Sequence, residues 1–124
     1  MADIFRSERT FQVWHYTAAH HDRLLLRSTA DEANHRRVDL YVESVRGLLL
    51  ESLYRGIVIR EGTPEEVREV ESGYGIPVTS EPVYLHVIGE ERMRGFIVGG
   101  PLQWHEDYGG FRDPSHFGPL PGTA

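Results

Sequence analysis

The chain has 124 residues, a net charge of −6 and no Cys. This length corresponds to a single domain over residues 1–124, which can bury a core without disulfide or metal support. The absence of thiols excludes disulfides, thiolate metal sites and a cysteine nucleophile, and the acidic balance argues against nucleic-acid binding. No stretch reaches the roughly 18 apolar residues of a membrane span and no signal sequence is visible, so we expect a soluble, cytoplasmic protein.

Two runs near the N-terminus, residues 11–18 and 23–28, are rich in aromatic and branched side chains. They predict a β-hairpin whose turn contains His20, His21 and Asp22. The polar residues 29–37 predict a loop. We expect the ordered core to span about residues 10–117, and residues 118–124 to form a tail.

The clearest strand of the sequence lies at residues 38–42, where Val38, Leu40 and Val42 alternate with other side chains. This alternation is the pattern of a strand with one buried face. The alternation slips at residues 44–47 before the leucines at residues 48–50. A slip of this kind predicts a bulge or bend, which would help the sheet to curl.

The strongest local signal predicts a helix over residues 64–72. Thr63 is a preferred N-cap, Pro64 suits the first helical position, and Glu66 is placed to complete a capping box. Gly73 predicts the end of this helix. Two valines give the helix a narrow apolar strip.

Short strands are predicted on both sides of this helix, at residues 56–60 before it and at residues 83–88, 93–98 and 102–106 after it. Most of the predicted strands follow each other without intervening helices, which favours antiparallel pairing. We therefore predict a mainly β (α+β) fold, an antiparallel β-roll or small barrel of six or seven strands with one short helix.

The predicted hairpin at residues 83–98 is apolar on both faces, so it needs two burial partners. One partner is the domain core. The other is the helix, a C-terminal brace containing Phe111 and Phe117, or a second copy of the chain. Because the helix offers little apolar surface, we expect a homodimer, which Ile97→Arg should dissociate. The two faces carry Val83, Leu85, Val87, Phe96 and Val98, and Tyr84, His86, Ile88, Met93 and Ile97, respectively.

The last predicted strand delivers several chemically capable side chains in succession. In a strand, Trp104 and Glu106 point to one face and His105 to the other, so these side chains cannot all converge. A His or Glu at the mouth of a barrel could act as a general base, while the structural alternative makes Trp104 a core residue beside a solvated strand end. The candidate catalytic residues are His105, Glu106 and His86, and the candidate ligand-binding residues are Trp104, Tyr84, Arg27 and Asp107.

The seven histidines show no metal-binding spacing, so we expect no metal site and no cofactor. His86 lies between apolar neighbours, where a hydrogen-bonded structural histidine and a histidine that lines a ligand cavity are the two interpretations. The sequence contains no nucleophile elbow and no phosphate-binding glycine loop.

Several segments together resemble a family of small single-domain proteins from GC-rich bacteria. These are residues 23–28, residues 37–41 with 48–50, and residues 104–107 with 113–117. The resemblance covers most of the chain and implies no activity and no site.

Two functions remain open from the sequence. The first is a non-enzymatic binding domain that contacts a protein partner, or itself, through an apolar sheet face. The second is a small-molecule-binding barrel with simple acid/base activity. An open, aromatic-lined pocket of about 300 Å³ or more would favour the second function, and an interior filled with side chains would favour the first.

Overall fold

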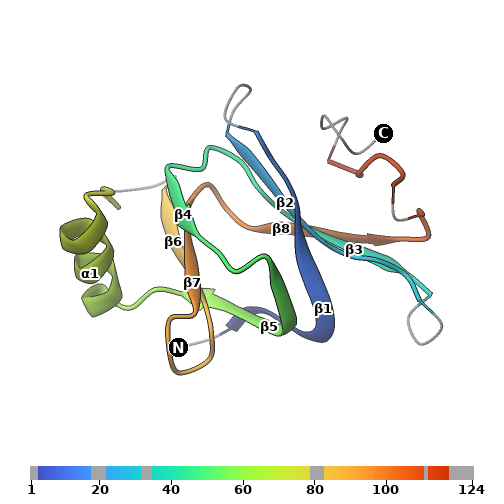
Figure 1. Cartoon of the computed structure of the whole chain (residues 1–124). Helices are drawn as coiled ribbons and strands as arrows, with labels where there is room; N and C mark the ends of the chain where they lie inside the picture. Colours follow the sequence, from blue (N-terminus) through green and yellow to red (C-terminus); the bar gives the residue numbers. More distant parts are fainter. Residues whose placement is uncertain (1–2, 18–21, 32–34, 79–82, 111, 118–124) are drawn as a thin grey trace.

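The computed structural model describes residues 3–17, 22–31, 35–78, 83–110 and 112–117. Within these ranges, eight antiparallel strands form one open sheet in the order β4-β7-β6-β5-β1-β2-β3-β8 (Figure 1). The mainly β class with a short helix is confirmed, whereas the prediction of six or seven strands and of a closed barrel is wrong. The predicted tail and the turn histidines, His20 and His21, lie outside the described residues. The elements are β1 (Asp3–Thr17), β2 (Arg23–Ser28), β3 (Arg37–Val42), β4 (Gly47–Leu49), β5 (Leu53–Glu61), α1 (Pro64–Tyr74), β6 (Tyr84–Ile88), β7 (Gly95–Gly99) and β8 (Gln103–Asp107).

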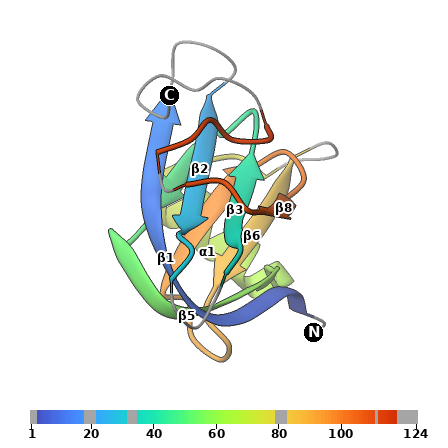
Figure 2. The same cartoon turned by 90° about the vertical axis from the view of Figure 1, so that its right-hand side faces the viewer.

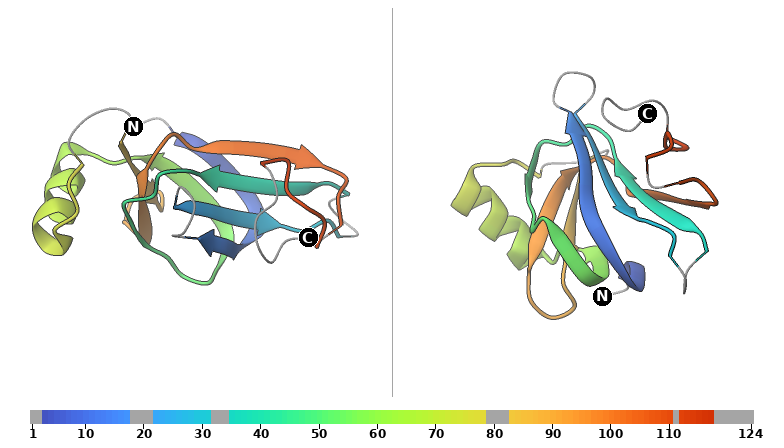
Figure 3. Two further views of the ribbon diagram at one scale, coloured as in Figure 1. Left: turned by 90° about the horizontal axis from the view of Figure 1, so that it is seen from above. Right: turned by 45° about the vertical axis from the view of Figure 1, so that its right-hand side comes forward.

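Strand β1 joins the two halves of the sheet. Its first part pairs with β5 and its last part with β2, and register shifts interrupt both ladders. Such irregularities bend a strand, and the sheet is strongly curled as a result (Figures 1 and 3). The strand predicted at residues 11–18 is longer than expected, because β1 begins at Asp3. Its first residues place Arg6 and Glu8 outward, and Phe5 packs against the core.

Strands β3 and β4 are separate elements, so of the two predicted alternatives, a bulge or a bend at residues 44–47, the chain has the bend, at Ser44. Ser44 has a positive φ of 54°, a left-handed conformation that turns the chain out of β3. The Val45 N–H then donates to the Asp22 carbonyl, and the Arg46 N–H donates to the Val98 carbonyl. The chain therefore crosses to the other end of the sheet, where β4 pairs with β7.

Helix α1 begins as the sequence predicts. Thr63 Oγ1 accepts a hydrogen bond from the Glu66 N–H at 3.1 Å, and the Glu66 carboxylate accepts one from the Thr63 N–H at 2.9 Å. The predicted end is wrong by two residues, since the left-handed C-cap is Gly75, with φ 68°, and not Gly73. The helix is not long and apolar enough to cross a membrane, and the described residues include no helix that is.

Both faces of the β6–β7 hairpin are covered within the chain. One face lies on the main core, where Ile97 is fully buried. Helix α1 covers the other face through Val70, helped by residues that follow the helix, including Ile76. The predicted grouping of Leu85, Val87, Phe96 and Val98 on one face is confirmed, whereas Met93 packs on this face and not on the opposite one. The argument that the helix offers too little apolar surface fails, because the segment after the helix adds to it.

The core fills the concave side of the curled sheet. Its central residues have exposed fractions of 0–3%. The C-terminal segment lies at the opposite end of the molecule from α1 and crosses over β2 and β3 on their outer face (Figures 1 and 2). The buried residues of the main core are Phe11, Leu24, Leu26, Val38, Leu40, Val42, Val45, Tyr54, Ile57, Ile59, Ile88 and Ile97.

The capping box gives a direct test of the helix start. Replacing Thr63 by Ala removes the side-chain acceptor for the Glu66 N–H, and we expect a loss of about 1 kcal/mol in the free energy of unfolding. Urea unfolding followed by circular dichroism measures this loss. Thr63→Ser, which keeps the acceptor, is the matched control, and a Thr63→Ala midpoint equal to that of the Ser variant would contradict the expectation.

Candidate functional site

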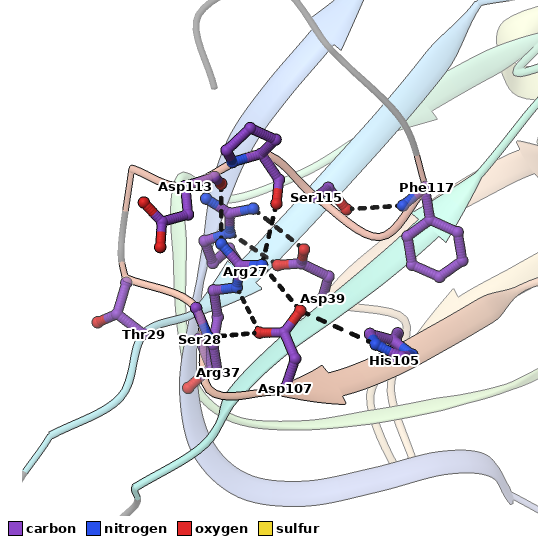
Figure 4. A network of polar contacts seen from close by, with 12 residues as sticks. Arg27, Ser28, Thr29, Arg37, Asp39, His105, Asp107, Asp113, Ser115 and Phe117 are labelled. Atoms are coloured by element: carbon purple, nitrogen blue, oxygen red, sulfur yellow. Dashed lines mark hydrogen bonds and ion pairs between the residues drawn. The ribbon is translucent and has the colours of Figure 1, made fainter. Parts of the chain in front are cut away.

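The candidate residues on β8 divide between the two faces of the sheet. Trp104 and Glu106 lie opposite Leu40 and Val38 of β3, which puts them on the core side. His105 and Asp107 point to the outer face, beneath the C-terminal segment (Figure 4). The predicted alternation is confirmed, so His105 and Glu106 do not share one pocket.

The outer face carries two arginine–carboxylate pairs, one between β2 and β3 and one between β3 and β8. Arg27 donates to Asp39 through two nitrogens, at 2.7 and 3.0 Å, and the exposed fractions of the two side chains are 0% and 2%. The guanidinium carbon of Arg27 also lies 5.2 Å from the centre of the Trp14 ring. A guanidinium that is held in this way is fixed by the fold, which argues against the predicted role of Arg27 as a free ligand-binding group.

The second pair organises the C-terminal segment. Arg37 donates to the two carboxylate oxygens of Asp107 at 2.9 and 2.8 Å, and its remaining donors reach the carbonyls of Gly110, Asp113 and Pro114 (Figure 4). Burial by itself would raise the pKa of Asp107, but the hydrogen bonds from Arg37 outweigh it and hold that pKa below its ordinary value. We call residues 109–110 and 112–117 the C-terminal brace; Phe111, one of its two predicted anchors, lies outside the described residues.

Two aromatic stacks fix the far end of the C-terminal brace. The Phe117 ring lies parallel to Tyr41, with 4.6 Å between the ring centres. The His116 ring lies on His105, with 3.8 Å between the ring centres and an angle of 14°. Burial, and then the hydrogen bond to Glu43, raise the pKa of Tyr41 to about 12, so the hydroxyl stays protonated at neutral pH.

His86 and Tyr84 lie on β6, which is not a neighbour of β8 in the sheet. The exposed fraction of His86 is 3%, and its Nε2 lies 2.7 Å from the Gly100 carbonyl oxygen. Its buried Nδ1 has no hydrogen-bond partner. Burial lowers the pKa of His86 below its ordinary value of 6.5, so the imidazole is neutral and Nε2 carries the proton that it donates to Gly100. This geometry matches the structural interpretation of His86.

The pKa of His86 predicts how stability changes with pH. A lowered pKa in the folded state means that the unfolded chain binds the proton first. The contribution of neutral His86 to the free energy of unfolding is therefore complete above the ordinary pKa of 6.5. This contribution is lost as the pH falls from 6.5 toward the lower pKa of the folded state. We expect His86→Gln, which keeps a donor for the Gly100 carbonyl, to lose less of its urea midpoint than wild type between about pH 7.5 and about pH 5.5. An equal loss in both proteins would contradict this. His35→Gln, at an exposed position, is the control.

Trp104 and Glu106, on the core side of β8, lie near the exposed side chains of Arg36 and Tyr108. Trp104, 47% exposed, lies 5.3 Å from the Phe5 ring centre. Arg36 reaches Glu106 at 3.9 Å, donates to the Tyr108 hydroxyl at 3.2 Å and lies 5.1 Å from the centre of that ring. Tyr108 is 73% exposed. We call Trp104, Arg36, Glu106 and Tyr108 the β8 stripe.

Shallow hollows adjoin the outer face of the sheet. One of about 420 Å³ is lined by Gln12, Trp14 and Thr29 together with Ala30, Gly109 and Gly110. Another of about 250 Å³ includes Arg27 and lies beside Arg9 and Ser28. The described residues contain no group of three or more His, Asp or Glu side chains that could hold a metal ion.

Comparisons with protein-family models, with curated proteins and with solved structures find no match to this chain. The site is therefore defined by its own geometry.

The sequence analysis missed Arg36, Arg37 and His116 as members of the site. The two arginines fall within residues 29–37, the segment predicted to be a polar loop. A signal was present in the charges, since Arg36-Arg37 directly precedes one strand and Glu106-Asp107 ends another. Antiparallel pairing of these two strands brings the opposite charges together, with Arg37 beside Asp107.

Proposed function

We propose that the protein is a small binding domain that adds an extended segment of a partner protein to its sheet at β8. Strand β8 is one of the two edges of the sheet, and its five residues pair with β3 without interruption. It contains no Pro and no Lys, the residues that commonly protect an edge from further pairing. The other edge, β4, has only three residues and offers a shorter template.

The observation that carries this proposal is the composition of the β8 stripe. Trp, Tyr and Arg are the residue types that contribute most to binding energy at protein interfaces. Here Trp104 and Tyr108 stand exposed beside a strand edge that pairs with no other described residues, and Arg36, with a side-chain exposure of 54%, contacts Tyr108 and Glu106. Backbone hydrogen bonds along β8 would supply affinity, and the stripe would select side chains of the added strand.

Panning of a random peptide library against the folded protein tests the proposal. We expect wild type to enrich peptides that Trp104→Ser/Tyr108→Ser does not retain. Leu49→Ser is the matched control, because Leu49 is as exposed as Trp104 but lies on the opposite edge strand, β4. No enrichment, or equal retention by the double variant, would refute a peptide site at β8.

A second copy of the chain is the other candidate occupant. The face of the hairpin that suggested a homodimer is covered by α1, and the fully buried Ile97 belongs to the core, so Ile97→Arg would unfold the domain. We therefore propose a partner of different sequence. Light scattering at micromolar concentration should give a monomer mass, whereas a dimer that Trp104→Ser dissociates would make the second copy the partner.

Small-molecule binding with acid/base catalysis has less support. Of the candidate residues, His105 and Glu106 lie on opposite faces of β8, and His86 is buried on β6. The hollow of about 420 Å³ contains a single aromatic residue, Trp14, among its lining residues. A thermal-shift screen against metabolites tests this alternative, since a ligand of the folded state raises the unfolding temperature.

A further inference from the structure

The His105–His116 stack joins the C-terminal brace to the edge strand. His105 projects from β8, and His116 comes from the far end of the C-terminal brace. The two rings are nearly parallel, with 3.8 Å between their centres, and His105 has a side-chain exposure of 36%. Solvent therefore reaches this pair in the folded domain.

The chemistry of this stack depends on its charge. Two neutral imidazoles, or one neutral and one protonated ring, attract each other when stacked. Two protonated rings at this separation repel, because like charges so close together are destabilising in a partly buried site. Free imidazole gains its proton within the mildly acidic range, around pH 6.5.

The surrounding charges do not neutralise a doubly protonated stack. Asp107 Oδ2 lies 3.9 Å from His105 Nε2, but this carboxylate is already paired with Arg37. The Asp113 carboxylate accepts the Gly110 N–H. The charged groups beside the stack are Asp107, next to His105 on β8, and Asp39, opposite His105 on β3, together with their respective partners Arg37 and Arg27.

We propose that the C-terminal brace is a pH-sensitive latch, whose far end leaves the sheet when both His105 and His116 are protonated. The Arg37 hydrogen bonds hold the near end, at Gly110, Asp113 and Pro114. The far end is held by the histidine stack and by the neighbouring Phe117–Tyr41 stack. Loss of the first stack weakens the second, because His116 and Phe117 are adjacent in the chain.

Opening of the latch uncovers an aromatic surface on β2 and β3. Leu25 and Tyr41 are buried beneath Phe117, with Trp14 beside them. This surface lies on the outer face of the sheet, opposite the core-side face that carries Trp104. The latch is therefore separate from the β8 stripe and does not depend on the proposed peptide binding.

Trp14 reports on the latch when Trp104 is replaced by Phe. In this background we expect the Trp14 emission to shift to the red between about pH 8 and about pH 5, and acrylamide quenching to roughly double, with unchanged far-UV circular dichroism. His105→Phe and His116→Phe each keep an aromatic ring and remove one charge, so both should abolish the change. His35→Gln, which alters an exposed histidine elsewhere, should retain it.

Three results would overturn the latch. The first is a Trp14 signal that stays constant across this pH range. The second is the same pH response in both Phe variants as in the parent protein. The third is a circular dichroism change in step with the fluorescence, which would assign the signal to global unfolding. None of these three results bears on the proposed peptide site, which is tested separately by panning with wild type at neutral pH.

Discussion

Replacing Asp39 by Asn is expected to destabilise the domain by about 3–5 kcal/mol, because it removes the buried counter-charge that Asp39 supplies to Arg27. Arg27 is 1% exposed, and both of its contacts to Asp39 are short hydrogen bonds. Asn keeps the size and shape of the side chain, so the loss reports on charge and not on packing. Urea unfolding at neutral pH measures it.

The double variant Arg27→Met/Asp39→Leu is the control for this pair. It removes both charges and fills the space with apolar side chains, so we expect it to recover most of the stability that Asp39→Asn loses. If Asp39→Asn were as stable as wild type, Arg27 and Asp39 would not form a buried ion pair. A double variant less stable than Asp39→Asn would show that the ion pair itself dominates, and not the loss of the counter-charge of Arg27.

Replacing Arg37 by Met is expected to detach the C-terminal brace and to lower the free energy of unfolding by about 2–3 kcal/mol. Arg37 is 2% exposed and satisfies the Asp107 carboxylate together with three carbonyls of the C-terminal brace. Urea unfolding gives the energy, and cleavage by a protease within residues 109–117 reports the detachment.

Two further variants sharpen the test of Arg37. Arg36→Met alters the neighbouring arginine, which is 54% exposed, and should change stability by no more than about 0.5 kcal/mol. Gly109→Ala should reproduce part of the Arg37→Met effect, because a Cβ at Gly109 would lie 2.6 Å from the guanidinium carbon of Arg37. Equal protease sensitivity of Arg36→Met and Arg37→Met would remove the special role of Arg37.

Local signals in the sequence predicted local structure well. The strand at residues 38–42 and the capping box at Thr63 both appear where expected, but the prediction that this strand has one buried face is wrong, because β3 is buried on both faces. Each depends on side chains a few residues apart, whose geometry is set by the strand or helix period. The position of β4 could not be predicted in this way, since it follows from pairing with β7, which is distant in the sequence.

The candidate site was predicted only where it depends on local strand geometry, and not where it depends on pairing between distant segments. The division of Trp104 and His105 between two faces follows from strand geometry alone. The partner of Asp107 is Arg37, 70 residues away, and only the β3–β8 pairing reveals it. His86 was open to two interpretations in sequence, because burial by the folded sheet decides between a structural and a cavity-lining histidine.

The measurement that tests the central claim most directly is amide hydrogen exchange of the protein with and without a peptide enriched by panning. The β8 account predicts that added protection concentrates on the backbone of β8, Gln103–Asp107, with a change in the Trp104 indole N–H. Protection confined to α1 or to the C-terminal brace, with β8 unchanged, would contradict the account.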